Sequence, residues 1–276
     1  MPGSVSSPPT DATLTIAPPC SAIEAFHTSP VHITGASRGI GKATAAVLAA
    51  EGCNVVLTSR RQEALEEVAA ELRTAYPDVG VMAYAAHAAE PDDAAACVDA
   101  AIGRFGSVEV LVNNAGTNPY FGPMVDIDPV RAEKTVRLNQ FGVVLWTQLV
   151  WKASMAERGG AVVNVASVGG LVTEPGIGYY NATKAAVIHL TRQFAQELAP
   201  RVRVNAVAPG VVRTQLARGL WENNEDYLKA ALPLGRIGEP KDIAGVIAFL
   251  AGPRASWMTG QTIVVDGGAM VRSSIT

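Results

Sequence analysis

Short apolar runs alternate with longer amphipathic stretches along the chain from Pro30 to its end. The apolar runs predict strands at residues 31–34, 54–58, 79–84, 108–113, 161–166, 202–208 and 262–265. The stretches between them predict helices at about residues 39–51, 62–75, 91–105, 129–158, 179–198 and 240–250. Strands that are apolar throughout and alternate with helices indicate a parallel sheet with helices on both faces. The pattern therefore predicts a single-domain α/β fold with a doubly wound, seven-stranded parallel sheet.

The first predicted strand departs from this pattern. It reads Ser29-Pro30-Val31-His32-Ile33, whereas a buried central strand is normally an uninterrupted apolar run. Proline is tolerated at the first position of a strand, but a histidine inside a buried strand needs a hydrogen-bond partner. We therefore expect this strand to be short or imperfect.

Residues 1–29 differ in composition from the rest of the chain. They are rich in Ser, Pro, Thr and Ala, and their only charged residues are Asp11 and Glu24. They lack the basic start and apolar segment of a signal peptide and the arginines of a transit peptide. We interpret them as a disordered or irregular extension, or as the product of a start codon assigned too far upstream. Residues 30–276 are then the single folded domain.

Bulk composition excludes several classes of partner. The chain has 276 residues, 49% of them hydrophobic, and a net charge of -3, which gives no electrostatic reason to expect nucleic acid or an anionic membrane. No run of 18 apolar residues predicts a transmembrane helix. Cys20, Cys53 and Cys97 lack metal-site or C-x-x-C spacing. We therefore expect no metal, free thiols and a cytoplasmic location.

A glycine-rich turn follows the first predicted strand and leads into a helix. It reads Thr34-Gly35-Ala36-Ser37-Arg38-Gly39-Ile40-Gly41. Glycines are needed where the backbone turns tightly and approaches a phosphate, and a helix N-terminus attracts a pyrophosphate. The candidate nucleotide-binding residues here are Gly35, Ser37, Arg38, Gly39, Ile40 and Gly41.

The end of the second predicted strand bears on the choice of nucleotide. It reads Leu57-Thr58-Ser59-Arg60-Arg61, without the acid that usually binds a ribose 2′-hydroxyl. Ser59, Arg60 and Arg38 could instead bind a 2′-phosphate. This favours NADP(H), with NAD(H) possible; Arg60 and Arg61 as solvated helix-entry residues is the alternative.

A candidate acid/base pair lies in the helix predicted at residues 179–198. Tyr180 and Lys184 are four residues apart and share one helix face. A nearby ammonium favours the phenolate and lowers the pKa of a tyrosine, as a general acid/base near neutral pH requires. Alone, the spacing also fits a core-facing tyrosine beside a solvated lysine. Tyr179 has no lysine at the same spacing, so we interpret it as a packing residue.

Further motifs occur in a fixed order along the chain. They are Asn113-Asn114-Ala115-Gly116, Asn139, Ser167 thirteen residues before Tyr180, Pro209-Gly210 and Asp266-Gly267-Gly268. With the glycine turn, Tyr180 and Lys184, they resemble the short-chain dehydrogenase/reductase family in its ordinary-length branch, over about residues 31–271. The stretch at residues 233–240 is similar to beta-ketoacyl carrier-protein reductases. The resemblance implies a Rossmann-type fold, an NAD(P)-dependent oxidoreductase acting on CH–OH donors, and a homo-oligomer, tetramer or dimer.

The same resemblance implies a role for each motif residue. Tyr180 would give a proton to a carbonyl oxygen, and Lys184 would lower its pKa and hold the nicotinamide ribose. Ser167 would polarise the carbonyl, and Asn139 would hold a water that relays protons to Lys184. Besides Tyr180 and Lys184, the implied cofactor-binding residues are Asn113, Asn114, Ala115, Gly116, Pro209, Gly210, Val212 and Thr214. The aspartate common in the family after the third strand is replaced here by Ala86-His87-Ala88, so adenine would contact His87 or backbone.

Three functions compete at this point. The leading hypothesis is NADPH-dependent reduction of a ketone or beta-keto carbonyl to a secondary alcohol, with residues 213–234 as an apolar lid over a small-molecule substrate. A nucleotide-binding sensor or interaction protein without turnover is the second, mildly favoured by the irregular first strand. The third is an NAD-dependent alcohol dehydrogenase working oxidatively, disfavoured by Arg60.

Overall fold

A computed structural model describes residues 28–271 of the chain. Most of the extension expected at residues 1–29 therefore lies outside the described residues. Its last residue, Ser29, is buried and donates a hydrogen bond to Glu109 Oε2 at 2.7 Å. Pro30 O accepts from the backbone N–H of Glu109 at 3.0 Å. Ser29 and Pro30 thus pack against the loop before β4, and the boundary between the extension and the domain stays a prediction.

All seven strands belong to one parallel sheet, ordered β3-β2-β1-β4-β5-β6-β7. The strands are β1 Val31–Thr34, β2 Val55–Ser59, β3 Val81–Ala85, β4 Val110–Asn113, β5 Gly160–Val165, β6 Val202–Pro209 and β7 Thr262–Val265. The predicted strand ends lie within two residues of these bounds. The predicted sheet is confirmed.

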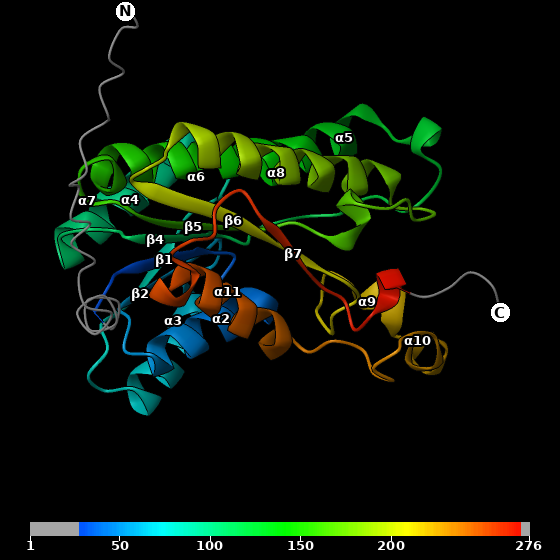
Figure 1. Cartoon of the computed structure of the whole chain (residues 1–276), viewed down its shortest axis with the longest axis horizontal. Coiled ribbons are helices and arrows are strands. Elements are labelled where there is room, and N and C mark those ends of the chain that lie inside the picture. The colour runs from blue at the N-terminus through cyan, green and yellow to red at the C-terminus, as the bar shows by residue number, and fades with distance from the viewer. Residues whose placement is uncertain (1–27, 272–276) are drawn as a thin grey trace, which may run out of the picture.

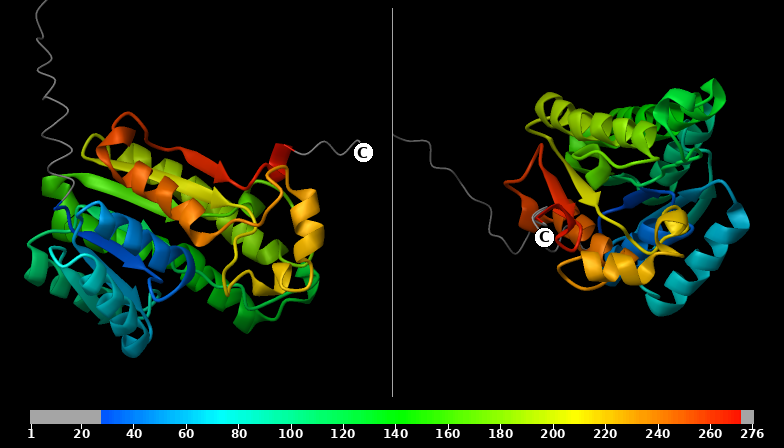
Figure 2. Two further views of the ribbon diagram at one scale, coloured as in Figure 1. Left: turned by 90° about the horizontal axis from the view of Figure 1, so that it is seen from below. Right: turned by 90° about the vertical axis from the view of Figure 1, so that its right-hand side faces the viewer.

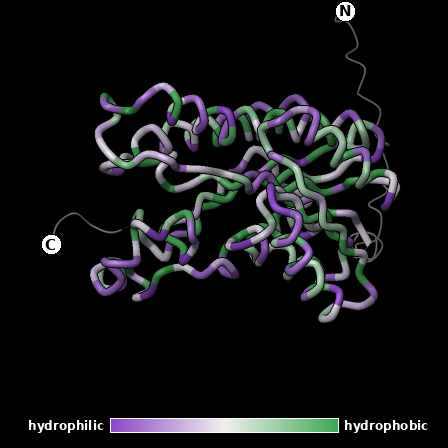
Figure 3. Tube along the Cα trace, turned by 180° about the vertical axis from the view of Figure 1, so that it is seen from behind, coloured by the Kyte–Doolittle hydropathy of each residue, from purple (hydrophilic) through white to green (hydrophobic). Residues whose placement is uncertain are grey.

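Helices cover both faces of the sheet (Figures 1 and 2). They are α2 Gly39–Ala50, α3 Gln62–Ala75, α4 Pro91–Phe105, α5 Pro129–Val136, α6 Gly142–Val150, α7 Ala156–Arg158, α8 Gly178–Glu197, α9 Arg218–Trp221, α10 Glu225–Ala231 and α11 Pro240–Ala251. One core layer joins α2, α3 and α11 to the sheet, and the other joins α4, α6 and α8. Hydrophobic residues accordingly follow the strands in Figure 3, while the outer turns are more hydrophilic.

The first strand is short but well formed. All four of its residues are buried. His32 Nε2 lies 2.9 Å from Thr58 Oγ1 on β2, and its ring lies 4.6 Å from the Trp146 ring of α6. Burial lowers the pKa of His32 to about 3. The histidine is therefore accommodated as a neutral core residue, with Thr58 as the partner that the sequence analysis required.

The predicted helix at residues 129–158 is not continuous. Two π turns, Arg137–Phe141 and Trp151–Met155, separate α5, α6 and α7. Single π turns inside helices are frequent at functional sites. Asn139, one of the candidate catalytic residues, lies in the first of them and is buried.

A chain of buried amides crosses the middle of the sheet. Asn113 on β4 and Asn164 on β5 are register partners, and Asn113 Nδ2 donates to Asn164 Oδ1 at 2.9 Å. Asn164 Nδ2 in turn donates to Thr191 Oγ1 on α8 at 2.9 Å. Asn113 Nδ2 also reaches Thr147 Oγ1 on α6 at 3.2 Å. These bonds tie two strands and the two helices above them.

The described part of the chain has neither a membrane-spanning helix nor a cluster of metal-ligating side chains. Between residues 28 and 271, no helix is long and apolar enough to cross a membrane. Over the same residues, no three His, Cys, Asp or Glu side chains form a group that could hold a metal ion.

The burial of His32 makes a prediction about acid stability. The unfolded chain binds a proton at His32 below pH 6.5, while the folded chain resists protonation until about pH 3. Unfolding therefore takes up a proton in this window, and stability falls as pH falls, by about 1.4 kcal/mol per pH unit. In His32→Val the free energy of unfolding should fall less steeply between pH 6.5 and 5 than in the parent. Urea unfolding at each pH measures this free energy, with exposed His189→Val as the control. Equal pH slopes of the free energy in His32→Val and the parent would contradict the prediction.

Candidate active site

The site lies beside β1, where the chain stops adding strands on one side of the sheet and begins adding them on the other. The chain builds β1, β2 and β3 outward on one side and then returns to place β4 on the other side of β1. The loops after β1 and β4 therefore separate and leave a crevice at the carboxyl ends of the strands, where open α/β sheets bind ligands. A cleft of about 1010 Å³ occupies this position.

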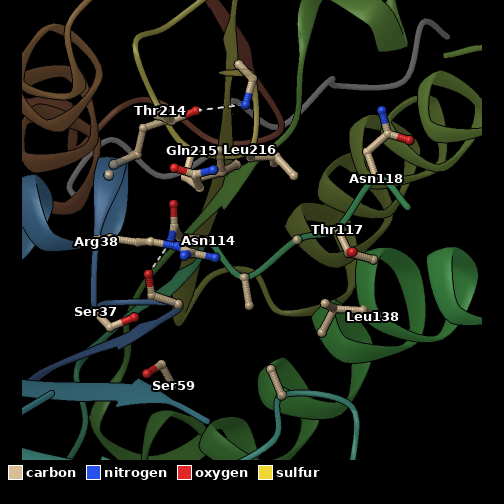
Figure 4. A pocket seen from close by; sticks show the side chains of 18 of the residues that line it. Ser37, Arg38, Ser59, Asn114, Thr117, Asn118, Leu138, Thr214, Gln215 and Leu216 are labelled. Carbon is tan, nitrogen blue, oxygen red and sulfur yellow. Dashed lines mark hydrogen bonds between the residues drawn. The ribbon is translucent and has the colours of Figure 1, made fainter. Parts of the chain in front are cut away.

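Asn114 joins the two loops that bound the crevice. Its Nδ2 donates to Thr34 O at 2.8 Å and to Gly35 O at 3.1 Å. Thr34 Oγ1 accepts from the backbone N–H groups of Asn114 and Ala115, each at 3.0 Å. Asn114 lines the cleft beside Ser37 and Arg38 (Figure 4). It thus sets the width of the crevice as well as forming part of its wall.

The three glycines of the first turn have different positions. Gly35 and Gly39 line the cleft with positive φ angles of 67° and 56°. At Gly39 an added Cβ would lie 3.4 Å from Thr214 Cγ2 across the cleft. Gly41 does not line the cleft: it packs so closely on Gly35 O and Asn114 Nδ2 that a Cβ would overlap both. This close packing shapes the turn, and the expected contact of Gly41 with the cofactor stays a prediction.

The charged side chains that line the cleft are all basic. Of the predicted nucleotide-binding residues, Ser37, Arg38, Ile40, Ser59 and Arg60 all line it. The sequence analysis missed three further basic residues in the wall, namely Arg61, Lys134 and Arg137. None of the described lining residues is acidic. Lys134 and Arg137 were missed because they lie in a helix that the amphipathic pattern explained as a covering element.

Ser167 and Tyr180 meet in the wall of the cleft. Ser167 follows β5 and caps the short 3-10 turn Val168–Gly170, and its Oγ accepts from the Gly169 N–H at 3.2 Å. Tyr180 is in the first turn of α8, is half-buried, and lines the cleft with Ser167. Burial raises the pKa of Tyr180; the nearby Ser167 hydroxyl lowers it in part, and the charge of Glu174 raises it further. The phenol is thus held in its protonated form.

Lys184 lies one turn from Tyr180, almost fully buried. Its Nζ donates to Val165 O at 2.7 Å and lies 5.6 Å from the centre of the Tyr180 ring. Burial lowers the pKa of Lys184 to about 8. The nitrogen is directed to the Val165 carbonyl, and the expected lowering of the Tyr180 pKa by this ammonium stays a prediction. Lys184 nevertheless lines the cleft as predicted.

Asn139 lies behind the residues that line the cleft. It does not line the cleft. Its Oδ1 accepts from the Thr117 N–H at 2.8 Å, and its Nδ2 donates to Thr117 O and Thr183 Oγ1, each at 3.0 Å. Both ends of the amide are thus engaged with the loop after β4 and with α8. This arrangement supports a positioning role, and the expected proton-relaying water stays a prediction.

The opposite wall comes from the segment after β6. Pro209, Gly210, Val212 and Thr214 all line the cleft as predicted, together with Ala115 and Gly116 from the loop after β4. Gly210 packs on Asp266, where a Cβ would lie 2.8 Å from the Asp266 Cβ. Asn113 is the exception among the predicted trough residues. It is buried in the amide chain described above and does not reach the cleft.

Comparison with known proteins agrees with this geometry. A family model described as "Enoyl-(Acyl carrier protein) reductase" matches residues 35–270. Dehydrogenase/reductase SDR family member 4 of Homo sapiens is 37% identical over 243 residues, which cover 87% of this chain and 87% of that protein. The chain belongs to the short-chain dehydrogenase/reductase family.

Solved structures of family members are also similar. Levodione reductase has a TM-score of 0.84 and 33% identity, covering 89% of this chain and 98% of its own. A metagenomic blue fluorescent protein in complex with NADPH has a TM-score of 0.80 and 32% identity, covering 87% of this chain and 97% of its own. This chain is accordingly an NAD(P)-dependent oxidoreductase of that family.

One family position differs here, as the sequence analysis expected. Ala86, His87 and Ala88 line the cleft after β3, where the family commonly has an aspartate. A nearby acid, Asp93 of α4, accepts from the His87 N–H at 3.0 Å. His87 Nδ1 accepts from the Ala89 N–H at 3.3 Å. The acidic side chain thus supports the loop from behind.

The segment expected as a lid is fastened by one arginine. Arg213 bonds both oxygens of Glu225 on α10 at 3.0 Å and Glu239 Oε1 at 3.0 Å. Its guanidinium also lies 4.9 Å from the Trp221 ring of α9. The hydrogen bonds of Arg213 lower the pKa of Glu225 to about 2. A single side chain next to the cleft residue Thr214 therefore holds both lid helices.

From the contacts of Arg213 we predict how its loss changes the mobility of the lid. In Arg213→Ala the lid loses both carboxylate contacts and the Trp221 contact, so it should open more often. Chymotrypsin cleavage at exposed Tyr227 should become roughly two- to fivefold faster. Arg218→Ala is the control, because Arg218 pairs only within the lid with Glu222. Equal cleavage rates for the two variants would show that Arg213 does not fasten the lid.

Proposed function

We propose that the protein uses NADPH to reduce a ketone or beta-keto carbonyl to a secondary alcohol, reversibly. The observation that carries the proposal is the meeting of Tyr180, Ser167 and Lys184 in the wall of a cleft whose opposite end is basic. A positive-φ glycine cradle and an acid-free cleft wall fit a dinucleotide. The nicotinamide, when bound, supplies a hydride to the carbonyl carbon.

The chain's own residues supply the proton and the orientation. The Tyr180 hydroxyl gives its proton to the carbonyl oxygen as the C–H bond forms, leaving an alcohol and a phenolate. Ser167 donates a hydrogen bond to the same oxygen, since its Oγ already accepts from the Gly169 N–H. Lys184, whose pKa burial lowers to about 8, can bind ribose hydroxyls and return a proton towards Tyr180. Asn139 holds Thr117 and Thr183 in place around this group.

The preference for NADP(H) over NAD(H) rests on the end of β2. Ser59, Arg60 and Arg61 line the cleft there together with Arg38. Guanidinium groups bind a phosphate well and offer nothing specific to a ribose diol. The alternative, in which Arg60 and Arg61 are merely solvated, is weakened because both line the cleft.

The competing sensor hypothesis has less support than it had from sequence. Its main argument was an irregular first strand, and β1 is short but fully buried and bonded on both sides. We also propose a cytoplasmic location, consistent with the buried, unoxidised thiol of Cys97. A homo-oligomer remains part of the proposal by analogy with the family.

Tyr180→Phe tests the proton donor. The variant keeps the ring and loses the hydroxyl, so ketone reduction should fall by about 10²- to 10⁴-fold while NADPH affinity changes little. The measurement is loss of reduced-nicotinamide absorbance over a panel of ketones, with NADPH binding followed by fluorescence. Tyr179→Phe is the matched control, since Tyr179 does not line the cleft. A Tyr180→Phe enzyme of parental rate would remove Tyr180 from its role.

Arg60→Ala tests the cofactor preference. Loss of a charge-assisted contact costs about 1.5–3 kcal/mol, or roughly 10- to 100-fold in NADPH affinity. NADH affinity should change much less, because NADH lacks the 2′-phosphate. Both affinities are measured by titration, with Arg104→Ala, an exposed arginine on α4 outside the cleft, as the control. A parallel loss for the two nucleotides would contradict the assignment.

A further inference from the structure

An acidic side chain stands beside the proton donor without an assigned role. Glu174 lies in the loop between the Val168–Gly170 turn and α8, and it is half-buried. Within residues 28–271 it makes no ion pair. Its Oε2 accepts from Asn181 Nδ2 at 3.3 Å. Asn181 directly follows Tyr180 on α8.

Asn181 depends on this contact. It is 5% exposed, and its Oδ1 has no hydrogen-bond partner among the described residues. The bond to Glu174 is therefore the side-chain contact that orients the buried amide. Buried polar groups are nearly always hydrogen-bonded, so loss of the Glu174 contact would leave the buried Asn181 amide without a side-chain partner among the hydrogen bonds described.

Glu174 and Asn181 pack closely against the turn that follows Ser167. A Cβ at Gly169 would overlap Asn181 Oδ1 and come within 2.5 Å of Glu174 Oε2. Gly169 in turn donates its N–H to Ser167 Oγ at 3.2 Å. Any movement of the pair is thus transmitted through Gly169 to the hydroxyl that faces Tyr180.

The charges around Tyr180 make Glu174 distinctive. Lys184 faces the Tyr180 ring from α8 but directs its Nζ to the Val165 carbonyl. The other titratable groups in the cleft wall are basic, namely Arg38, Arg60, Arg61, His87, Lys134 and Arg137, and Tyr179 adjoins Tyr180 on α8. Burial is the main cause of the raised pKa of Tyr180, and the charge of Glu174 adds to it. A negative neighbour disfavours the phenolate and so keeps the proton on the donor.

We infer that Glu174, through Asn181 and Gly169, is a positioning residue that aligns Ser167 with Tyr180, and that its negative charge adds to the burial that keeps the Tyr180 hydroxyl protonated. The inference rests on the proposed function for its catalytic meaning. Its electrostatic half is a property of the folded chain that needs no substrate to be observed.

Titration of Tyr180 tests the electrostatic half. The ring carbon of ζ-¹³C-labelled Tyr180 is assigned by its loss in Tyr180→Phe and followed by NMR as alkali is added. Glu174→Gln keeps the size and an accepting oxygen but removes the charge, so the resonance should begin to move roughly half a pH unit to one unit lower. Glu197→Gln, at the far end of α8, is the control and should not shift it. An onset in Glu174→Gln equal to that of the parent would overturn the electrostatic role.

Kinetics test the positioning half. Glu174→Ala also removes the Asn181 bond, so kcat should fall about tenfold below that of Glu174→Gln, with the KM for NADPH unchanged in both. The acidic limb of the alcohol-oxidation pH profile should move lower in both variants, which a purely structural loss would not cause. Equal kcat for the Gln and Ala variants would overturn the positioning role. If the parent turns over no ketone or alcohol, the proposed function fails, and the NMR titration still decides the role of Glu174.

Discussion

The amide of Asn114 is the contact on which the site depends. A doubly wound sheet must part its loops where the strand order reverses, and loops that part without restraint would not keep a fixed crevice. Asn114 spans that gap, bonding the Thr34 and Gly35 carbonyls from the far loop. Gly41 lacks a Cβ at the place where one would overlap this amide. The crevice is thus a fixed feature of the sheet edge, and the catalytic side chains are arranged along it.

Much of this arrangement was readable from the chain. The positions of the strands and of most helices follow from apolar runs and their spacing, and many of the motif residues lie on loops that line the cleft. Prediction worked there because glycines, asparagines and the Tyr180–Lys184 spacing are each required by local geometry. The doubtful β1 was read correctly as unusual, and the sequence could not reveal that Thr58 and Trp146 would accept His32, since both are distant in the chain.

The features that the sequence did not reveal have a common physical origin. Gly41 and Asn113 were assigned to the cofactor trough by motif, and the structure adds that Gly41 packs on Gly35 and Asn114 while Asn113 bonds Asn164. The π turn at Asn139 and the basic residues Lys134 and Arg137 were missed because hydrophobic periodicity does not report a single extra residue in a turn, nor which polar side chains lean into a cleft. Lys184 was expected to act on the phenol, and its carbonyl contact at Val165 could not be read from spacing alone.

The buried amide pair of β4 and β5 has a consequence for how this sheet assembles. A slip of one residue between these strands would turn Asn113 and Asn164 to opposite faces, among aliphatic side chains. Each stranded amide would cost about 1–3 kcal/mol. The Asn113–Asn164 pair therefore favours the correct register between β4 and β5 during folding. Asn114 directly follows Asn113, and Ser167 lies three residues after Asn164. The pairing that selects the strand register therefore also fixes how far Asn114 and Ser167 lie from each other along the strand direction.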